Sequence, residues 1–129
     1  MAFAMKRVYE PPAPSDGHRV LVDRLWPRGI SKERAELDEW AKDVAPSPGL
    51  RTEWHHAGGE RFDEFAARYR AELDANAAAR ALLATGREHE RVTLLFGARD
   101  ERVNHASVLL GWLAEHGGDV ERSSPGRRG

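Results

Sequence analysis

A chain of 129 residues with 40% apolar and 32% charged side chains has the size and composition of one folded domain, which excludes an intrinsically disordered protein. Its 20 Lys and Arg residues nearly balance 21 Asp and Glu residues, so the net charge of −1 gives no general electrostatic basis for binding nucleic acid or a membrane surface. The absence of cysteine excludes disulfides, thiolate nucleophiles and cysteine-ligated metals. No apolar run approaches the ~20 residues that span a bilayer, and the apolar start is too short for a signal peptide. We therefore expect a cytoplasmic protein.

Three segments have the apolar patterns of β-strands. The first alternates weakly and precedes a proline-rich loop, and the second follows the turn dipeptide Asp16-Gly17. The second contains three consecutive aliphatic residues at positions 20–22, which is typical of a central parallel strand covered on both faces. The predicted strands are Phe3–Tyr9, His18–Leu25 and Arg91–Gly97.

Five segments have helical patterns or helical start signals. Ser31 and Ser47 are suited to cap the first two, and the third has a regular stripe of apolar residues facing a core. Gly86 is a natural stop for the alanine-rich fourth helix. The predicted helices are Lys32–Glu36, Pro48–His56, Glu60–Ala75, Ala77–Thr85 and Asn104–His116.

The segment from Leu37 to Val44 fits either a short helix or an irregular third strand, and we prefer the strand. Strands separated by helices indicate an α/β fold, namely a small three-layer domain with a mostly parallel sheet of three or four strands flanked by helices. We assign this domain to residues 1–117. Residues 118–129 are expected to form a disordered tail, because they contain little to bury.

In open α/β sheets, ligands bind beyond the C-terminal ends of the strands. Three turns of this chain occupy such positions: one after the second strand, one before Pro48 and one after the last strand. If the sheet is parallel, these turns share one rim. The polar and aromatic residues on that rim are Asp23, Arg24, Trp26, Arg28, Ser47, Arg51, Arg99, Asn104 and His105.

The four arginines of this rim predict a binding site for a small anionic molecule. Guanidinium groups bind phosphate and carboxylate groups through paired hydrogen bonds, and helix N-termini favour the same groups. Alternatively, the arginines form structural ion pairs, which resemble functional sites in sequence. The available carboxylates are Asp23, Asp38, Asp43 and Asp100.

Two titratable residues of the rim are candidate catalytic groups. Asp23 follows a buried aliphatic run, where a carboxylate needs a partner. It is either a general base or a group that orients an arginine or histidine, or it has a structural role as half of an Asp–Arg pair or as a cap for the Arg28–Gly29 turn, and we prefer the structural role. His105 is the best acid–base candidate, and a surface histidine beside a helix cap is the simpler interpretation. Trp26 and Trp54 could stack on a base or a sugar, although aromatic residues at strand ends more often serve in packing.

We expect no cofactor and no metal. The chain lacks the glycine-rich phosphate loops, the Gly-x-Ser-x-Gly elbow and the His-Glu-x-x-His pattern. His55 and His56 are adjacent on a helix and point about 100° apart, so they are poor joint ligands. The sequence predicts no oligomeric state.

Two classes of function remain. In the first, the arginines hold an anionic substrate while Asp23 or His105 moves protons, as in a hydrolase or transferase. In the second, the same pocket belongs to a non-catalytic ligand-binding or protein-interaction module.

Five stretches carry motifs whose joint occurrence is specific to one family. They are DGHRVLVDRLWPRG (residues 16–29), LDEWAKDVAPSPGLR (37–51), FDEFAARYRAEL (62–73), VTLLFGARD (92–100) and NHASVLL (104–110). On these motifs the chain resembles the YeaO-like family within the domain of unknown function numbered 488 (DUF488), and the resemblance covers about residues 5–115.

The resemblance implies a small three-layer α/β fold and brings no established activity. Members of the wider group often have a Cys-His-Arg triplet at the start of the last helix. The corresponding residues here are Asn104, His105 and Ala106, so the resemblance retains the histidine and gives no basis for thiol chemistry.

Overall fold

The computed structural model describes residues 2–56, 61–100 and 104–121, without the side chains of His55 and His56. This part of the chain contains a four-stranded sheet in the order β1-β4-β2-β3, and all neighbouring strands run parallel. The predicted α/β fold with a parallel sheet is therefore confirmed. The strands are β1 (Ala2–Arg7), β2 (His18–Leu21), β3 (Glu39–Trp40) and β4 (Arg91–Phe96).

The ambiguous segment before Ala45 contains β3 and then a single 3-10 turn, η2 (Lys42–Val44), so the preference for a strand is confirmed over two residues. A second 3-10 turn, η1 (Pro14–Asp16), precedes β2. No described helix is both long and apolar enough to cross a lipid bilayer. The helices are α1 (Lys32–Ala35), α2 (Pro48–His56), α3 (Phe62–Asp74), α4 (Ala77–Glu88) and α5 (His105–Glu115).

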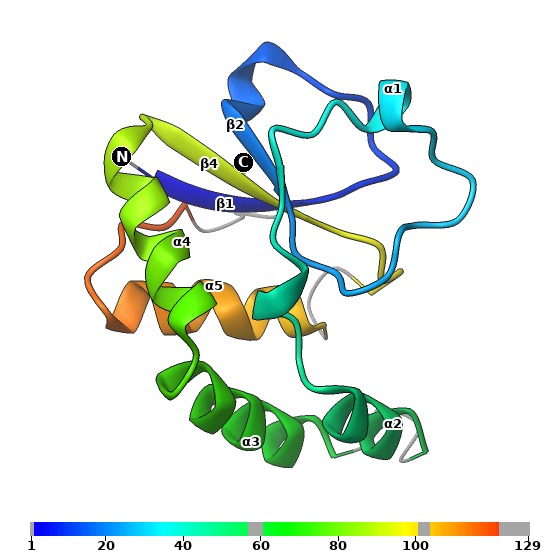
Figure 1. Ribbon diagram of the computed structural model, residues 1–129, viewed down its shortest axis with the longest axis vertical. Helices are drawn as coiled ribbons and strands as arrows, with labels where there is room; N and C mark the ends of the chain where they lie inside the picture. The colour runs from blue at the N-terminus through cyan, green and yellow to red at the C-terminus, as the bar shows by residue number, and fades with distance from the viewer. Residues whose placement is uncertain (1, 57–60, 101–103, 122–129) are drawn as a thin grey trace, which may run out of the picture.

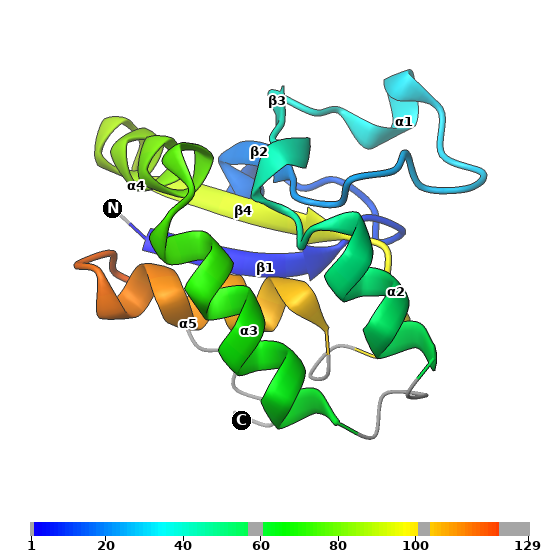
Figure 2. The ribbon, with the colours of Figure 1, turned by 60° about the horizontal axis from the view of Figure 1, so that its bottom comes forward.

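The two faces of the sheet have unequal coverings. On one face, alternate strand residues such as Phe3, Val20 and Leu94 join α3, α4 and α5 in the main core. On the other face, Leu21 and Leu95 belong to a small cluster beneath loops and α1. Figure 1 shows α3 and α5 on one side of the sheet and α1 on the other. Figure 2 shows α2 beyond the arrowheads of β1 and β4, at the end of the sheet where the pocket described below lies.

Buried charges stabilise the second face of the sheet where it lacks apolar contacts. Asp16 and Arg19 are each 4% exposed, and the carboxylate of Asp16 lies 2.5 Å from the Arg19 guanidinium and 3.0 Å from the Lys6 ammonium. Burial tends to raise the pKa of Asp16, but the hydrogen bonds from the Ala13 N–H, Lys6 and Arg19 hold that pKa below its ordinary value. We call Lys6, Asp16 and Arg19 the Asp16 cluster.

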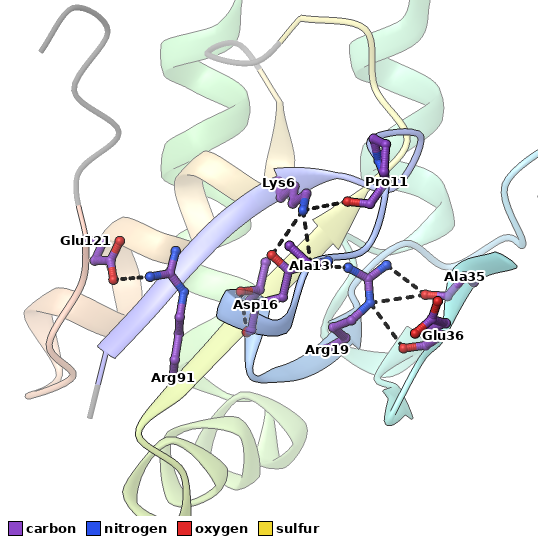
Figure 3. Close-up of polar contacts among 10 residues, drawn as sticks. Lys6, Pro11, Ala13, Asp16, Arg19, Ala35, Glu36, Arg91 and Glu121 are labelled. Atoms are coloured by element: carbon purple, nitrogen blue, oxygen red, sulfur yellow. Dashed lines mark hydrogen bonds and ion pairs between the residues drawn. The ribbon is translucent and has the colours of Figure 1, made fainter. Parts of the chain in front are cut away.

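The Asp16 cluster also holds neighbouring backbone segments in place (Figure 3). Arg19 donates to the main-chain oxygens of Ala35 and Glu36, which fixes the end of α1. The Thr93 hydroxyl donates to the main-chain oxygen of Asp16 at 2.7 Å, which joins the cluster to β4. Each cation of the cluster therefore has acceptors, and the buried carboxylate has donors on both oxygens.

Strand β2 ends earlier than predicted. Val22 still donates to the Leu95 main-chain oxygen at 3.0 Å, but the chain then leaves the sheet. At the next position the carboxylate of Asp23 accepts the N–H of Gly97, so a side chain replaces the backbone as hydrogen-bond partner. Leu25, predicted to lie in the strand, is 59% exposed.

The prediction that Gly86 ends the fourth helix is wrong, because α4 continues through it to Glu88. A Cβ atom at position 86 would lie 2.3 Å from Cζ of Phe3. The glycine is therefore needed for the close approach of the Phe3 ring to the helix, and its helix-stopping tendency is overridden by packing.

The first residues of the predicted tail pair with the sheet. Phe3 donates to the main-chain oxygen of Asp119, Glu121 donates to that of Phe3, and both distances are 2.7 Å. Gly117 has a φ of 98°, which turns the chain back toward β1, and Val120 packs against the main core. Residues 122–129 of the predicted tail lie outside the described residues.

Candidate functional site

A cavity of about 410 Å³ lies at the C-terminal ends of the strands. The three turns predicted to share one rim all contribute to its walls, together with α2 and α3. This placement follows from the parallel sheet, because parallel strands end on the same edge. The lining residues are Asp23, Arg24, Leu25, Trp26, Pro27, Arg28, Ala45, Pro46, Arg51, Trp54, Phe65, Gly97, Ala98, Asn104 and His105.

Asp23 joins the ends of two strands at the base of this pocket. Its Oδ2 accepts the Gly97 N–H at 2.8 Å, and its main-chain oxygen accepts the indole N–H of Trp40 at 2.8 Å. Its Oδ1 is buried and lies 3.2 Å from Nε2 of His105, which is an ion-pair distance without hydrogen-bond geometry. The neighbours of this carboxylate are thus a histidine and a backbone amide, and no Asp23–arginine ion pair is found among the described residues.

His105 is the first residue of α5, and its ring is held by a hydrogen bond to one main-chain oxygen and lies beside a carboxylate. Nε2 lies 3.1 Å from the main-chain oxygen of Val22 and 3.2 Å from Oδ1 of Asp23. Because both neighbours are acceptors, the neutral ring carries its proton on Nε2, which leaves Nδ1 as the nitrogen with a lone pair. The side chain is 16% exposed, so this histidine belongs to the pocket wall and is no free surface residue.

Asn104 lines the pocket, but both ends of its amide are used by the main chain. Its Oδ1 accepts the N–H of Ser107 at 2.8 Å, and its Nδ2 donates to the main-chain oxygen of Asp100 at 2.7 Å. The residue is 1% exposed and acts as the N-cap of α5. It therefore positions His105.

Three of the four predicted rim arginines, Arg24, Arg28 and Arg51, line the pocket, and Arg99 lies outside its wall. Within residues 2–56, 61–100 and 104–121, none of these four forms an ion pair with a carboxylate. The described residues therefore give no support to the alternative that these arginines form structural ion pairs. Among the described lining residues, only Asp23 carries a carboxylate that opposes the positive charge of the pocket.

Arg24 is the most enclosed of these cations. Its Nη2 donates to the main-chain oxygens of Ala45 and Pro46 at 3.3 and 3.5 Å, and its Nε is buried without a hydrogen-bond partner among the described residues. Long bonds to two neutral oxygens compensate a partly buried guanidinium only in part. Arg28 and Arg51 are exposed at the mouth.

Ser47 is absent from the wall of the pocket. Its N–H and its hydroxyl both donate to the carboxylate of Glu72, at 2.9 and 2.6 Å, and the hydroxyl oxygen accepts the N–H of Leu50 at 3.2 Å. These bonds fasten the start of α2 to α3. The predicted cap is confirmed, whereas the hydroxyl has no contact with the pocket.

Two indole rings face the pocket from different elements. Trp26 donates its Nε1–H to the main-chain oxygen of Ile30 at 2.6 Å and meets Trp40 edge-on, with ring centroids 5.4 Å apart. Trp54, on α2, stacks on Phe65 of α3 at 4.3 Å with an interplanar angle of 17°. Both rings are therefore fixed by contacts of their own.

Sequence reasoning missed Leu25 and Phe65 as pocket residues. Leu25 was placed in a strand, and Phe65 was placed in the core because it lies on the apolar stripe of α3. A stripe residue at the end of a core has the same periodicity as one inside it, so no sequence signal separates the two cases. Behind Phe65, the Tyr69 hydroxyl donates to the main-chain oxygen of Val44, and burial raises the pKa of that phenol.

The described residues contain no group of three His, Asp or Glu side chains placed to hold a metal ion. The two histidines considered as ligands, His55 and His56, have side chains outside the described residues.

Comparison with known proteins places these features in a family. The family model described as "DUF488-N3i: Inactive DUF488-N3 subclade" matches residues 2–126. The chain is 45% identical over 115 residues to "Uncharacterized protein YeaO" of Escherichia coli strain K12, covering 88% of this chain and 97% of that protein. It is 52% identical over 104 residues to "Uncharacterized protein Rv3073c" of Mycobacterium tuberculosis strain H37Rv and to "Uncharacterized protein Mb3100c" of Mycobacterium bovis, covering 80% of this chain and 86% of each relative. No solved structure matches the chain at a significant level.

Proposed function

Because the chain belongs to the YeaO-like DUF488 family, in a subclade described as inactive, we propose that its pocket binds a small anionic ligand without converting it. The ligand carries a phosphate or carboxylate group, which the pocket arginines hold.

The observation that carries this proposal is the unpaired charge of Arg24, Arg28 and Arg51. Elsewhere in the described chain, some arginines form ion pairs on the open surface, as Arg68 does with Glu53 and Arg70 with Glu115, whereas isolated ones such as Arg34 do not. In the pocket, three guanidinium groups face one cavity without a carboxylate partner. An anion would compensate this charge and supply acceptors for the unused N–H groups.

The composition of the wall favours binding over turnover. Among the described residues, the lining includes no serine, threonine, cysteine or lysine, so the only side chains of this wall that could act as covalent nucleophiles are Asp23 and His105. Oδ2 of Asp23 is already bonded to the N–H of Gly97. The position that carries a cysteine in the wider group holds Asn104, whose amide is used in capping.

A second candidate, acid–base catalysis, is favoured by the pair formed by Asp23 and His105. A carboxylate 3.2 Å from Nε2 orients the ring and leaves Nδ1 to accept a proton. If this candidate is correct, the protein hydrolyses or transfers a phosphate or acyl group. Incubation with a panel of phosphate and carboxylate esters distinguishes the two, since turnover that disappears in His105→Gln would replace the first candidate by the second.

Thermal denaturation with anions tests the binding proposal. We expect inorganic phosphate, pyrophosphate or short dicarboxylates to raise the Tm increasingly with ligand concentration, because a ligand that binds only the folded state stabilises it by mass action. Arg28→Ala and Arg51→Ala should remove most of that shift. Arg34→Ala is the matched control, since Arg34 is exposed on α1 and lies outside the pocket wall. No shift with any anion, or equal shifts in all variants, would reject the proposal.

A cytoplasmic location is part of the same proposal. It rests on the composition, in particular on the absence of cysteine from a chain of this size. Cell fractionation of the native host tests it, and recovery of the protein outside the cytoplasmic fraction would contradict it.

A further inference from the structure

We propose that the anion recognised by this pocket is carried on a flat ring, as in a nucleoside monophosphate or an aryl phosphate. This inference deepens the proposed function and depends on it. It assigns the arginines to the charged group and the aromatic wall to the ring.

The size of the cavity exceeds what a bare anion needs. Its volume is about 410 Å³, whereas a water molecule occupies about 30 Å³ in the liquid. An inorganic phosphate, with five heavy atoms, would leave most of this space to solvent. The volume lies within the range of about 300–1,000 Å³ that is usual for sites of organic ligands.

Aromatic side chains from two separate elements line the cavity. Trp26 comes from the turn after β2, and Trp54 comes from α2, with Phe65 stacked against it. Each indole is held by contacts of its own: the Ile30 oxygen and Trp40 hold Trp26, and Phe65 holds Trp54. Rings that are fixed before binding lose little conformational entropy when a ligand stacks on them.

Leu25 adds an apolar contact that the folded chain itself does not use. It is 59% exposed and lines the same cavity as the arginines. An exposed large apolar side chain next to unpaired cations suits a ligand with both an apolar and a charged part. A sugar phosphate or a small dicarboxylate would neutralise the arginines and leave this apolar surface exposed to water.

A ligand series on the native protein tests the inference. Dissociation constants are measured by calorimetry for inorganic phosphate, ribose 5-phosphate, phenyl phosphate, AMP and UMP. We expect phenyl phosphate or a nucleoside monophosphate to bind at least about fivefold more tightly than ribose 5-phosphate, which is the lower end of the contribution of ring stacking. Tighter binding of phenyl phosphate alone would identify an aryl ligand, and tighter binding of AMP or UMP a nucleotide.

Two variants locate the ring. Trp54→Leu and Trp26→Leu keep an apolar side chain but remove a stacking surface, and at least one should reduce the preference for ring-bearing anions to below about twofold. Phe62→Leu is the matched control. The ring centroids of Phe62 and Trp54 are 5.8 Å apart, but Phe62 does not line the cavity. Circular dichroism confirms that each variant is folded.

The outcomes separate this inference from the proposal beneath it. If phosphate and ribose 5-phosphate bind as tightly as the ring-bearing anions, the ring assignment is overturned while anion binding stands. If the preference persists in both tryptophan variants, the assignment is also overturned. If none of the five ligands binds, the proposed function itself fails.

Discussion

Two groups of charged residues, one on the second face of the sheet and one at its C-terminal edge, are built in opposite ways. In the Asp16 cluster, two cations surround one buried carboxylate, and each group has hydrogen-bond partners at 2.5–3.1 Å. In the pocket, three arginines have no carboxylate partner among the described residues, although Asp23 lines the same cavity. The first group serves the fold, and we propose that the second is available to another molecule.

The largest effect should follow from breaking the Asp16 cluster. Asp16→Asn leaves a buried guanidinium without its carboxylate, so we expect a loss of about 3 kcal/mol in the free energy of unfolding. Urea denaturation measures this loss. Glu64→Gln is the control, because Glu64 pairs with Arg61 at the surface with 57% of its side chain exposed, and it should change stability little. Equal effects of the two changes would show that the cluster is not a structural element.

Acid should weaken the same cluster. The folded-state pKa of Asp16 lies below its ordinary value of 3.8, so the folded protein releases this proton more readily than the unfolded chain. Its contribution to stability is therefore complete above about pH 4 and is lost as the pH falls through the lower folded value. Urea midpoints between pH 7 and pH 2.5 should fall less steeply for Asp16→Asn than for the native protein. Parallel curves would assign the acid sensitivity to other carboxylates.

An intermediate effect is expected at Asp23, which has a structural bond inside the pocket. Asp23→Ala leaves the N–H of Gly97 unpaired and should cost about 1–3 kcal/mol. Asp23→Asn retains an oxygen for that N–H and should cost less. Unfolding free energies for both variants, with hydrogen exchange at Gly97, measure the difference. A smaller loss for the alanine variant would mean that the bond to Gly97 contributes nothing.

The smallest effect on stability should come from the exposed pocket arginines. Arg28→Ala and Arg51→Ala remove no ion pair in the described chain, so each should change the free energy of unfolding by no more than about 0.5 kcal/mol. Urea denaturation measures this change in the free energy of unfolding. A loss as large as that of Asp16→Asn would place these residues in the fold and abolish the contrast between the two groups.

The sequence was sufficient to predict where the pocket lies. The rule that parallel strands deliver their following turns to one edge brought together Asp23, Arg28 and His105, which are far apart in the chain. The aliphatic residues 20–22 before Asp23 indicated that its carboxylate would need a partner, and His105 lies at ion-pair distance from it. These features were predictable because they follow from local pattern and sheet direction.

The partners of individual side chains were not predictable, because they are set by packing between distant elements. Ser47 and Glu72 are 25 residues apart, and nothing in the sequence indicates that the serine is used by α3. The Asp16 cluster was missed because Lys6 and Arg19 lie in segments that read as ordinary strands. Gly86 was read as a stop because its close contact with Phe3 exists only in the folded chain.

Calorimetric titration of inorganic phosphate into the native protein and into the Arg28→Ala, Arg51→Ala double variant tests the central claim most directly. If unpaired arginines make the pocket an anion site, the native protein gives saturable binding that weakens with added salt, and the double variant gives none while remaining folded. Saturable binding of equal strength in both proteins, or none in the native protein with either phosphate or the ring-bearing anions, would contradict the claim.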